Sequence, residues 1–170
     1  MRRSLEVAGE HVTDDIEALR SIITELRPST LDALGLVPAL ATLAQRTKAV
    51  AGLDVTTEFE FEQQTGDRRL DPDLETAVYR VVQESLNNVV RHAEAQHVRL
   101  SVTSDGRELR IHVADDGEGF ATDQRSGGFG IVGMRERVEL AGGSLSITAS
   151  VDGTTVDARS PVVLAQPPAE

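Results

Sequence analysis

The apolar positions divide the chain into a long leading helix and a region of mixed helices and strands. In residues 4–27 the apolar side chains follow one another at steps of seven, four, three, four and three: Leu5, Val12, Ile16, Leu19, Ile23 and Leu26. This narrow seam predicts a coiled-coil or helical-hairpin segment, which needs a partner helix or this chain's own core to cover it. Pro28 ends the helix, because a residue before proline is disfavoured in the α conformation.

Residues 28–37 predict a short apolar joint with Gly35 as its pivot. A helix is expected from Pro38 to about Val50, closed by Gly52. Alternating apolar and polar residues then predict a strand over 55–61, and a polar loop follows over 63–69.

A second helix is expected from Pro72 to about Arg91, with Asp71 as its N-cap. Near its end, apolar residues at three- and four-residue steps predict a single apolar face: Leu86, Val89, Val90 and Ala93. Glu84 and Asn88 are four residues apart and therefore lie one turn from each other on one side of this helix.

The remaining pattern predicts two hairpins separated by a helix. Strands 98–103 and 109–114 meet around Asp105-Gly106, and strands 145–151 and 154–159 meet around Asp152-Gly153. Between the hairpins, a glycine-rich segment leads into a helix that ends at Gly142-Gly143. The order of elements predicts the α+β class, as a two-layer α/β sandwich with a mixed sheet covered by helices on one face.

Composition narrows the function classes. Aromatic residues make up only 3% of the chain, so the core must be aliphatic, and the absence of cysteine excludes disulfides and thiolate metal sites and fits a cytoplasmic protein. A net charge of −11 argues against nucleic acid as a partner, and means that a phosphate ligand needs a metal ion or local positive charge. No apolar run approaches the ~20 residues of a membrane span, so we expect no membrane segment.

Two groups of residues carry candidate chemistry. Glu84 and Asn88, followed by Arg91 and His92, suit a Mg²⁺ ion that holds a polyphosphate, although a solvated helix face would read the same way. Asp115 ends an apolar strand: the Asp-Gly that follows indicates a turn, or the carboxylate accepts a hydrogen bond from an exocyclic amine such as that of adenine.

Gly128 and Gly130 stand before a helix, where unpaired N–H groups attract phosphate. The segment is not a P-loop, since no Gly-Lys-Ser/Thr follows, and it lacks the leading β-α-β unit of dinucleotide-binding proteins. Residues 121–127 could form a lid. His97 and His112 lie on strand patterns with no carboxylate at a useful spacing, so we expect both to be structural.

Taken together, these motifs closely resemble the ATP-binding domain of the histidine kinases, a class of ATPases shared with gyrase and mismatch-repair proteins. The motifs are Glu-x-x-x-Asn-x-x-Arg-His, Asp-x-Gly-x-Gly and Gly-x-Gly-x-x-Gly-Met-Arg-Glu-Arg, in this order. Residues 83–93 and 133–137 look like the nitrate-sensor and desaturase-thermosensor subfamily, and the link over 26–36 matches it as well. The resemblance covers roughly residues 5 to 160.

The resemblance implies a role for each residue of the first motif. Asn88 would ligate Mg²⁺, while Glu84 would hold a metal-bound water or polarise the attacking group. Arg91 and His92 would face the phosphates of ATP.

It also implies the remaining nucleotide contacts. Asp115 would bind the adenine amine, with Thr154 nearby and Gly117 and Gly119 shaping the base pocket. The last motif would close on the nucleotide through its glycines and their neighbours: Gly128, Gly130, Ile131, Gly133 and Met134.

Three departures from the family pattern matter. Arg91 replaces a common lysine, Ile131 replaces a usual leucine, and no phosphoacceptor is present. His11 has no acid beside it and lies on what matches the second dimerisation helix.

The chain is therefore expected to be a piece of a sensor kinase. It would comprise a partial dimerisation helix (1–27), a linker (28–37), an ATP-binding catalytic domain (38–160) and a disordered tail (161–170). The full protein would form a homodimer through its N-terminal helices and pass the γ-phosphoryl group of ATP to a histidine and then to an aspartate of a response regulator. Two alternatives stay open: a serine kinase of the anti-sigma-factor type, against which the linker and leader argue, and a non-catalytic nucleotide-binding dimerisation module.

Overall fold

The computed structural model describes residues 28–61, 69–119 and 129–165. The expected leader helix, the lid at 121–127 and Gly128 lie outside these residues. The described helices are α2 (Ser29–Leu34), α3 (Leu36–Ala51), α4 (Pro72–Asn88), the π-helical turn η1 (Val89–Ala93) and α5 (Phe129–Leu140). The strands are β1 (Asp54–Phe61), β2 (His97–Ser104), β3 (Glu108–Asp115), β4 (Ser144–Ser150) and β5 (Gly153–Pro161).

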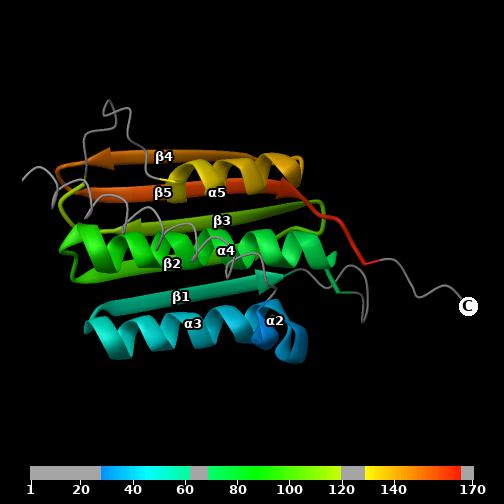
Figure 1. Cartoon of the computed structure of the whole chain (residues 1–170), viewed down its shortest axis with the longest axis horizontal. Helices are drawn as coiled ribbons and strands as arrows, with labels where there is room; N and C mark the ends of the chain where they lie inside the picture. Colours follow the sequence, from blue (N-terminus) through cyan, green and yellow to red (C-terminus); the bar gives the residue numbers. More distant parts are fainter. Residues whose placement is uncertain (1–27, 62–68, 120–128, 166–170) are drawn as a thin grey trace, which may run out of the picture.

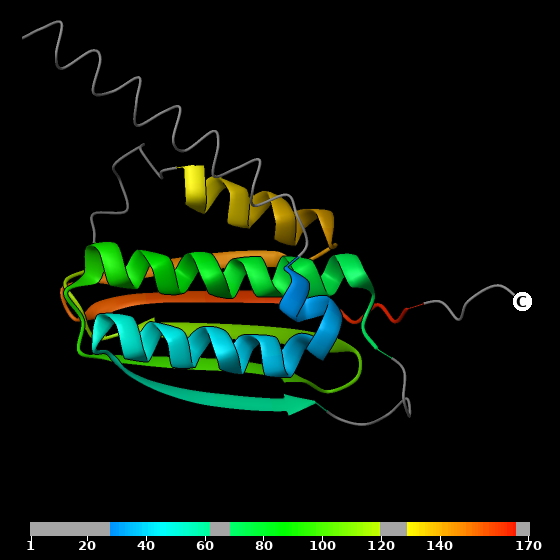
Figure 2. The ribbon, with the colours of Figure 1, turned by 60° about the horizontal axis from the view of Figure 1, so that its bottom comes forward.

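The strands form one mixed sheet in the order β1-β2-β3-β5-β4. β1 runs parallel to β2, and the other neighbours are antiparallel (Figure 1). Helices α3, α4 and α5 cover the same face of the sheet (Figure 2). The predicted two-layer α+β arrangement is confirmed.

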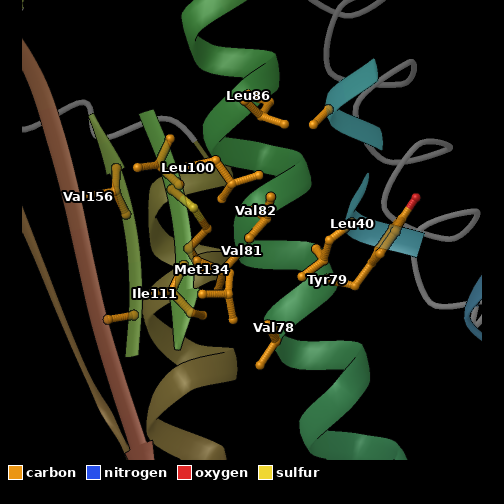
Figure 3. Packing of buried hydrophobic residues seen from close by; sticks show 14 of the residues in the cluster. Leu40, Val78, Tyr79, Val81, Val82, Leu86, Leu100, Ile111, Met134 and Val156 are labelled. Atoms are coloured by element: carbon orange, nitrogen blue, oxygen red, sulfur yellow. The ribbon is translucent and has the colours of Figure 1, made fainter. Parts of the chain in front are cut away.

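The core between the two layers is aliphatic, as the scarcity of aromatic residues requires. Alternating residues of β2 and β3, such as Leu100 and Ile111, point from the sheet toward Val78 and Val82 of α4 (Figure 3). Met134 brings α5 into the same cluster and is only 1% exposed. None of the helices in the described ranges is long and apolar enough to cross a membrane.

Local signals placed the helix ends correctly. The Asp71 carboxylate accepts a hydrogen bond from the backbone N–H of Asp73 at 2.9 Å, and Pro72 is the first residue of α4. Gly52 ends α3 in the left-handed conformation with φ +69°. The first hairpin turns at the predicted Asp105-Gly106, whereas the second turns one residue earlier than predicted, at Val151-Asp152, with Gly153 as the first residue of β5.

The end of α4 differs from the prediction. The α-helix stops at Asn88 and continues as η1, whose wider turn changes which side chains share a face. Val89 and Ala93, four residues apart, are both buried, whereas Val90 is turned to solvent and is 47% exposed. The prediction of Val90 as part of the apolar face was therefore wrong.

Two segments expected to be loose are paired with the domain. The backbone N–H of Val162 donates to Arg107, that of Asp71 donates to Val163, and Leu164 forms a β-bridge with Leu70. The expectation of a frayed tail is thus wrong for residues 161–165. The apolar joint predicted at 28–37 contains a short helix, α2, and Gly35, its predicted pivot, separates α2 from α3 with a φ of +81°.

Candidate functional site

One helix and the π turn behind it position the first group of predicted site residues. Glu84 and Asn88 are half-buried on α4, one turn apart as expected. Arg91 and His92 follow in η1 and are exposed. Single π turns often occur at functional sites, and this one sets the direction of the two basic side chains relative to Asn88.

Asp115, the last residue of β3, is held from two sides. Its Oδ1 accepts hydrogen bonds from the backbone N–H of Gly117 at 3.0 Å and of Thr154 at 3.3 Å, so the predicted proximity of Thr154 is confirmed. Within the part of the chain that the structure describes, both bonds go to Oδ1. The second carboxylate oxygen, Oδ2, therefore remains as an acceptor for a ligand amino group.

The two glycines after Asp115 are needed for close backbone packing. A Cβ on Gly117 would lie 2.1 Å from the carbonyl oxygen of Ala93, and a Cβ on Gly119 would lie 2.0 Å from that of Ser150. We expected both glycines to let a base approach. In the structure Gly117 packs against the backbone of η1, and Gly119 packs against the backbone at the end of β4. The loop after Asp115 is thereby fixed directly beside the turn that carries Arg91.

The start of α5 lies against the last turns of α4. A Cβ on Gly130 would stand 2.0 Å from Oε1 of Glu84, so glycine at this position leaves room for the Glu84 carboxylate in its present conformation. One turn further on, the Ser85 hydroxyl donates to the sulfur of Met134 at 3.7 Å. These contacts bring together the last motif and the first motif of the sequence.

Met134 does not lie where the sequence placed it. It is a core side chain, not one that faces a ligand, because the small-residue contacts at the start of α5 bring the helix close enough to bury it (Figure 3). Ile131 is half-buried and packs against the same core. Gly133 lies close to the Arg137 guanidinium of its own helix.

Sequence reasoning missed Asp116. Its carboxylate accepts hydrogen bonds from the backbone N–H groups of Gln96 and His97, each at 2.8 Å, and its Oδ2 lies 2.7 Å from Nδ1 of His97. The N–H and ring of His97, together with the N–H of Gln96, lower the pKa of Asp116 to about 2. His97 and His112 were expected to be structural because the sequence shows no carboxylate at a useful spacing; each in fact pairs with a carboxylate distant in the sequence, His112 with Asp157 at 2.8 Å.

The residues fit a metal ion that keeps most of its ligands outside the protein. In the described ranges no cluster of three or more His, Asp or Glu residues could hold a metal alone. Asn88 and Glu84 offer two side-chain oxygens on one helix face, the number that Mg²⁺ takes from a protein when phosphates and waters supply the others. Arg91 and His92 add positive charge locally to a chain of net charge −11.

The sequence of this chain matches a known protein family. Residues 73–164 match the family of histidine kinase-, DNA gyrase B-, and HSP90-like ATPases. The chain is 35% identical over 153 residues to the signal transduction histidine-protein kinase/phosphatase DegS of Brevibacillus brevis. That alignment covers 89% of this chain and 39% of the relative.

Solved structures share the fold. The blue-light activated histidine kinase EL346 of Erythrobacter litoralis superimposes with a TM-score of 0.60 and 25% identity, over 75% of this chain and 42% of that one. The histidine kinase AdeS of Acinetobacter baumannii superimposes with a TM-score of 0.61 over 92% of this chain and 84% of that one. At 15% identity, the latter supports the fold alone.

Proposed function

Because this chain belongs to the family of histidine kinase-, DNA gyrase B-, and HSP90-like ATPases, we propose that it binds Mg²⁺-ATP in the site described above. The observation that carries the proposal is the fixed carboxylate of Asp115. Two backbone N–H groups, those of Gly117 and Thr154, hold Oδ1, which leaves Oδ2 to accept the exocyclic amine of adenine.

The phosphates would extend from this base site toward η1. Arg91 and His92 would lie beside them, and the backbone N–H groups at the start of α5, near Gly130, would bind from the opposite side. Asn88 would ligate Mg²⁺ and Glu84 would orient a water or the attacking group. Bound Mg²⁺ would neutralise phosphate charge, and the residues around it would align the γ-phosphoryl group for in-line transfer.

The chain spans 39% of the length of the curated kinase that it matches, so the reaction of the full protein is part of the proposal. There the γ-phosphoryl group would pass to a histidine on a dimerisation helix and then to an aspartate of a response regulator. The leader helix over 4–27 would contribute to a homodimer. A cytoplasmic location would give the domain its ATP and fits a sequence without cysteine.

Calorimetric titration of ATP with Mg²⁺ tests the base site. The wild-type chain should bind with a Kd in the range of about 1–100 μM, whereas Asp115→Asn, which turns one acceptor into a donor, should show no measurable binding. Asp157→Asn, which changes a carboxylate on the open face of the sheet, is the matched control and should bind as wild type does.

Repeating the titration in EDTA tests the metal site. Affinity should fall in EDTA for the wild-type chain and stay unchanged for Asn88→Ala, which should already lack the metal contribution.

Equal binding of ATP by wild type and Asp115→Asn would contradict the adenine assignment. An Asn88→Ala variant that still responds to Mg²⁺ like wild type would remove Asn88 from the metal site.

A further inference from the structure

Asp115 and Asp116 are consecutive carboxylates with different surroundings. Asp115 faces Thr154 on β5, whereas Asp116 faces the start of β2 and is 46% exposed. Ion pairs on a protein surface contribute little to stability, so its bond to the His97 ring alone would be of small consequence. Asp116 also accepts hydrogen bonds from two backbone N–H groups, and these bonds connect its loop to another segment of the chain.

Those N–H groups belong to the segment that joins η1 to β2. The segment begins immediately after Arg91 and His92, turns at Glu94 with a positive φ of 52°, and reaches Gln96 and His97. Asp116 therefore binds Gln96 and His97, at the junction between β2 and the short connection that follows η1, the turn with the two basic side chains.

Further bonds connect the same two stretches of chain. The N–H of Asp116 donates to the carbonyl oxygen of His97 at 3.3 Å, and the N–H of Glu118 donates to that of Ala93 at 2.7 Å. Gly117, between them, lies against Ala93 as well. Among these described bonds, the ones that the Asp116 carboxylate accepts are made by a side chain, so a substitution there alters the connection while leaving the backbone bonds in place.

We propose that Asp116 is a positioning residue of the nucleotide site: it fixes the loop that carries the base-binding Asp115 against the turn that carries Arg91 and His92. The inference rests on the proposed function, since it assigns those residues to the two ends of one ATP molecule. Asp116 contacts no nucleotide. It acts by setting the separation of the two halves of the site before ATP arrives, which reduces the entropy lost on binding.

The sheet offers a matched pair for comparison. His112 and Asp157 lie 2.8 Å apart on β3 and β5; the Asp157 carboxylate is exposed about as much as that of Asp116 (52% against 46%), whereas the His112 ring is less exposed than that of His97 (40% against 66%). Asp157 accepts its described hydrogen bond from a ring nitrogen and lies within a continuous strand pair rather than at a loop. Loss of Asp157 thus reproduces the loss of an exposed His–Asp pair without the connection to η1.

The experiment is titration of Mg²⁺-ATP into wild type, Asp116→Ala, Asp116→Asn and Asp157→Ala, with thermal unfolding of each chain. Asp116→Ala should weaken ATP binding about tenfold, the lower end of the effect of supporting residues at metal sites. Asp116→Asn keeps a carbonyl oxygen for the two N–H groups and should recover most of the affinity. Asp157→Ala should bind ATP as wild type does, even where its melting temperature falls as much as that of Asp116→Ala.

Wild-type affinity in a folded Asp116→Ala chain would overturn the inference while leaving the proposed function intact. Equal weakening in Asp116→Ala and Asp157→Ala would also overturn it, since the effect would then follow stability. If the wild-type chain binds no ATP, the proposed function fails and the inference fails with it. Should Asp116→Ala not fold, Asp116→Leu removes the same acceptor oxygens while filling the space of the side chain; wild-type ATP affinity in that chain would overturn the inference.

Discussion

At the scale of single residues, the site depends on glycines, which carry no side chain, as much as on its polar side chains. Gly117 allows the loop after Asp115 to approach the backbone of η1 at a distance that a Cβ atom would prevent, and Gly130 leaves room for the carboxylate of Glu84 beside the start of α5. The functional groups of Glu84 and Asp115 are thereby brought to one side of the domain. Glycine here supplies space rather than flexibility.

The pH dependence of stability should reveal the carboxylate of Asp116. Its pKa is lowered from 3.8 to about 2, chiefly by the backbone N–H and ring of His97. Because the folded state holds this proton more weakly than the unfolded chain does, the stabilisation is complete above about pH 4 and is lost as the pH falls toward about 2. The difference in melting temperature between wild type and Asp116→Asn should therefore be constant from about pH 7 to 5 and shrink below about pH 4.

Thermal unfolding of both chains across this pH range, followed by circular dichroism, measures the difference in melting temperature. The imidazole of His97, which lies 2.7 Å from the Asp116 carboxylate, is present in both chains. A difference that stays constant to the lowest pH at which both chains fold would mean that the charge of Asp116 contributes nothing to stability.

At the scale of secondary-structure elements, most of the fold was predictable, because its signals are local. Asp71-Pro72 and Asp105-Gly106 specify a helix start and a hairpin turn from adjacent residues. The His97–Asp116 pair was not predictable in this way, since the pairing of β2 with β3 joins residues far apart in the sequence. The burial of Met134 was not predicted, because a methionine that follows a glycine motif can lie either in a core or beside a ligand and its sequence context is the same in both cases.

The π-helical turn η1 leads us to predict different stability losses at two neighbouring valines, which the α-helix expected from the sequence would not. Val89 is 5% exposed and Val90 is 47% exposed, although both fit an α-helical apolar stripe. Val89→Ala should reduce the free energy of unfolding by about 2 kcal/mol, from two buried carbon atoms and the cavity they leave. Val90→Ala should change it by less than about 0.5 kcal/mol.

Urea denaturation of the two variants is the direct comparison, with an unchanged m-value as the control that both unfold from the same folded state. Equal losses of stability would indicate that η1 is an ordinary α-helical turn in solution.

At the scale of the whole molecule, α2 belongs to the domain rather than to a flexible connection. Leu31 is completely buried, and its carbonyl oxygen accepts a hydrogen bond from Nη2 of Arg69 at 3.0 Å. The same guanidinium pairs with Glu75, which is 3% exposed on the first turns of α4. Helix α2 is thus attached to α4, the helix that carries Glu84 and Asn88.

Two leucines of α2 test whether this attachment persists in solution. Leu31→Ala should lower the free energy of unfolding by about 3 kcal/mol, as for other fully buried leucines, whereas Leu34→Ala, at a position 56% exposed, should lower it by less than about 0.5 kcal/mol. Chemical denaturation followed by circular dichroism measures both. Nearly equal and small losses would mean that α2 detaches readily and that residues 28–37 act as the hinge. The expected difference would instead mean that α2 is packed as part of the domain, with Leu31 in its core and Leu34 in solvent.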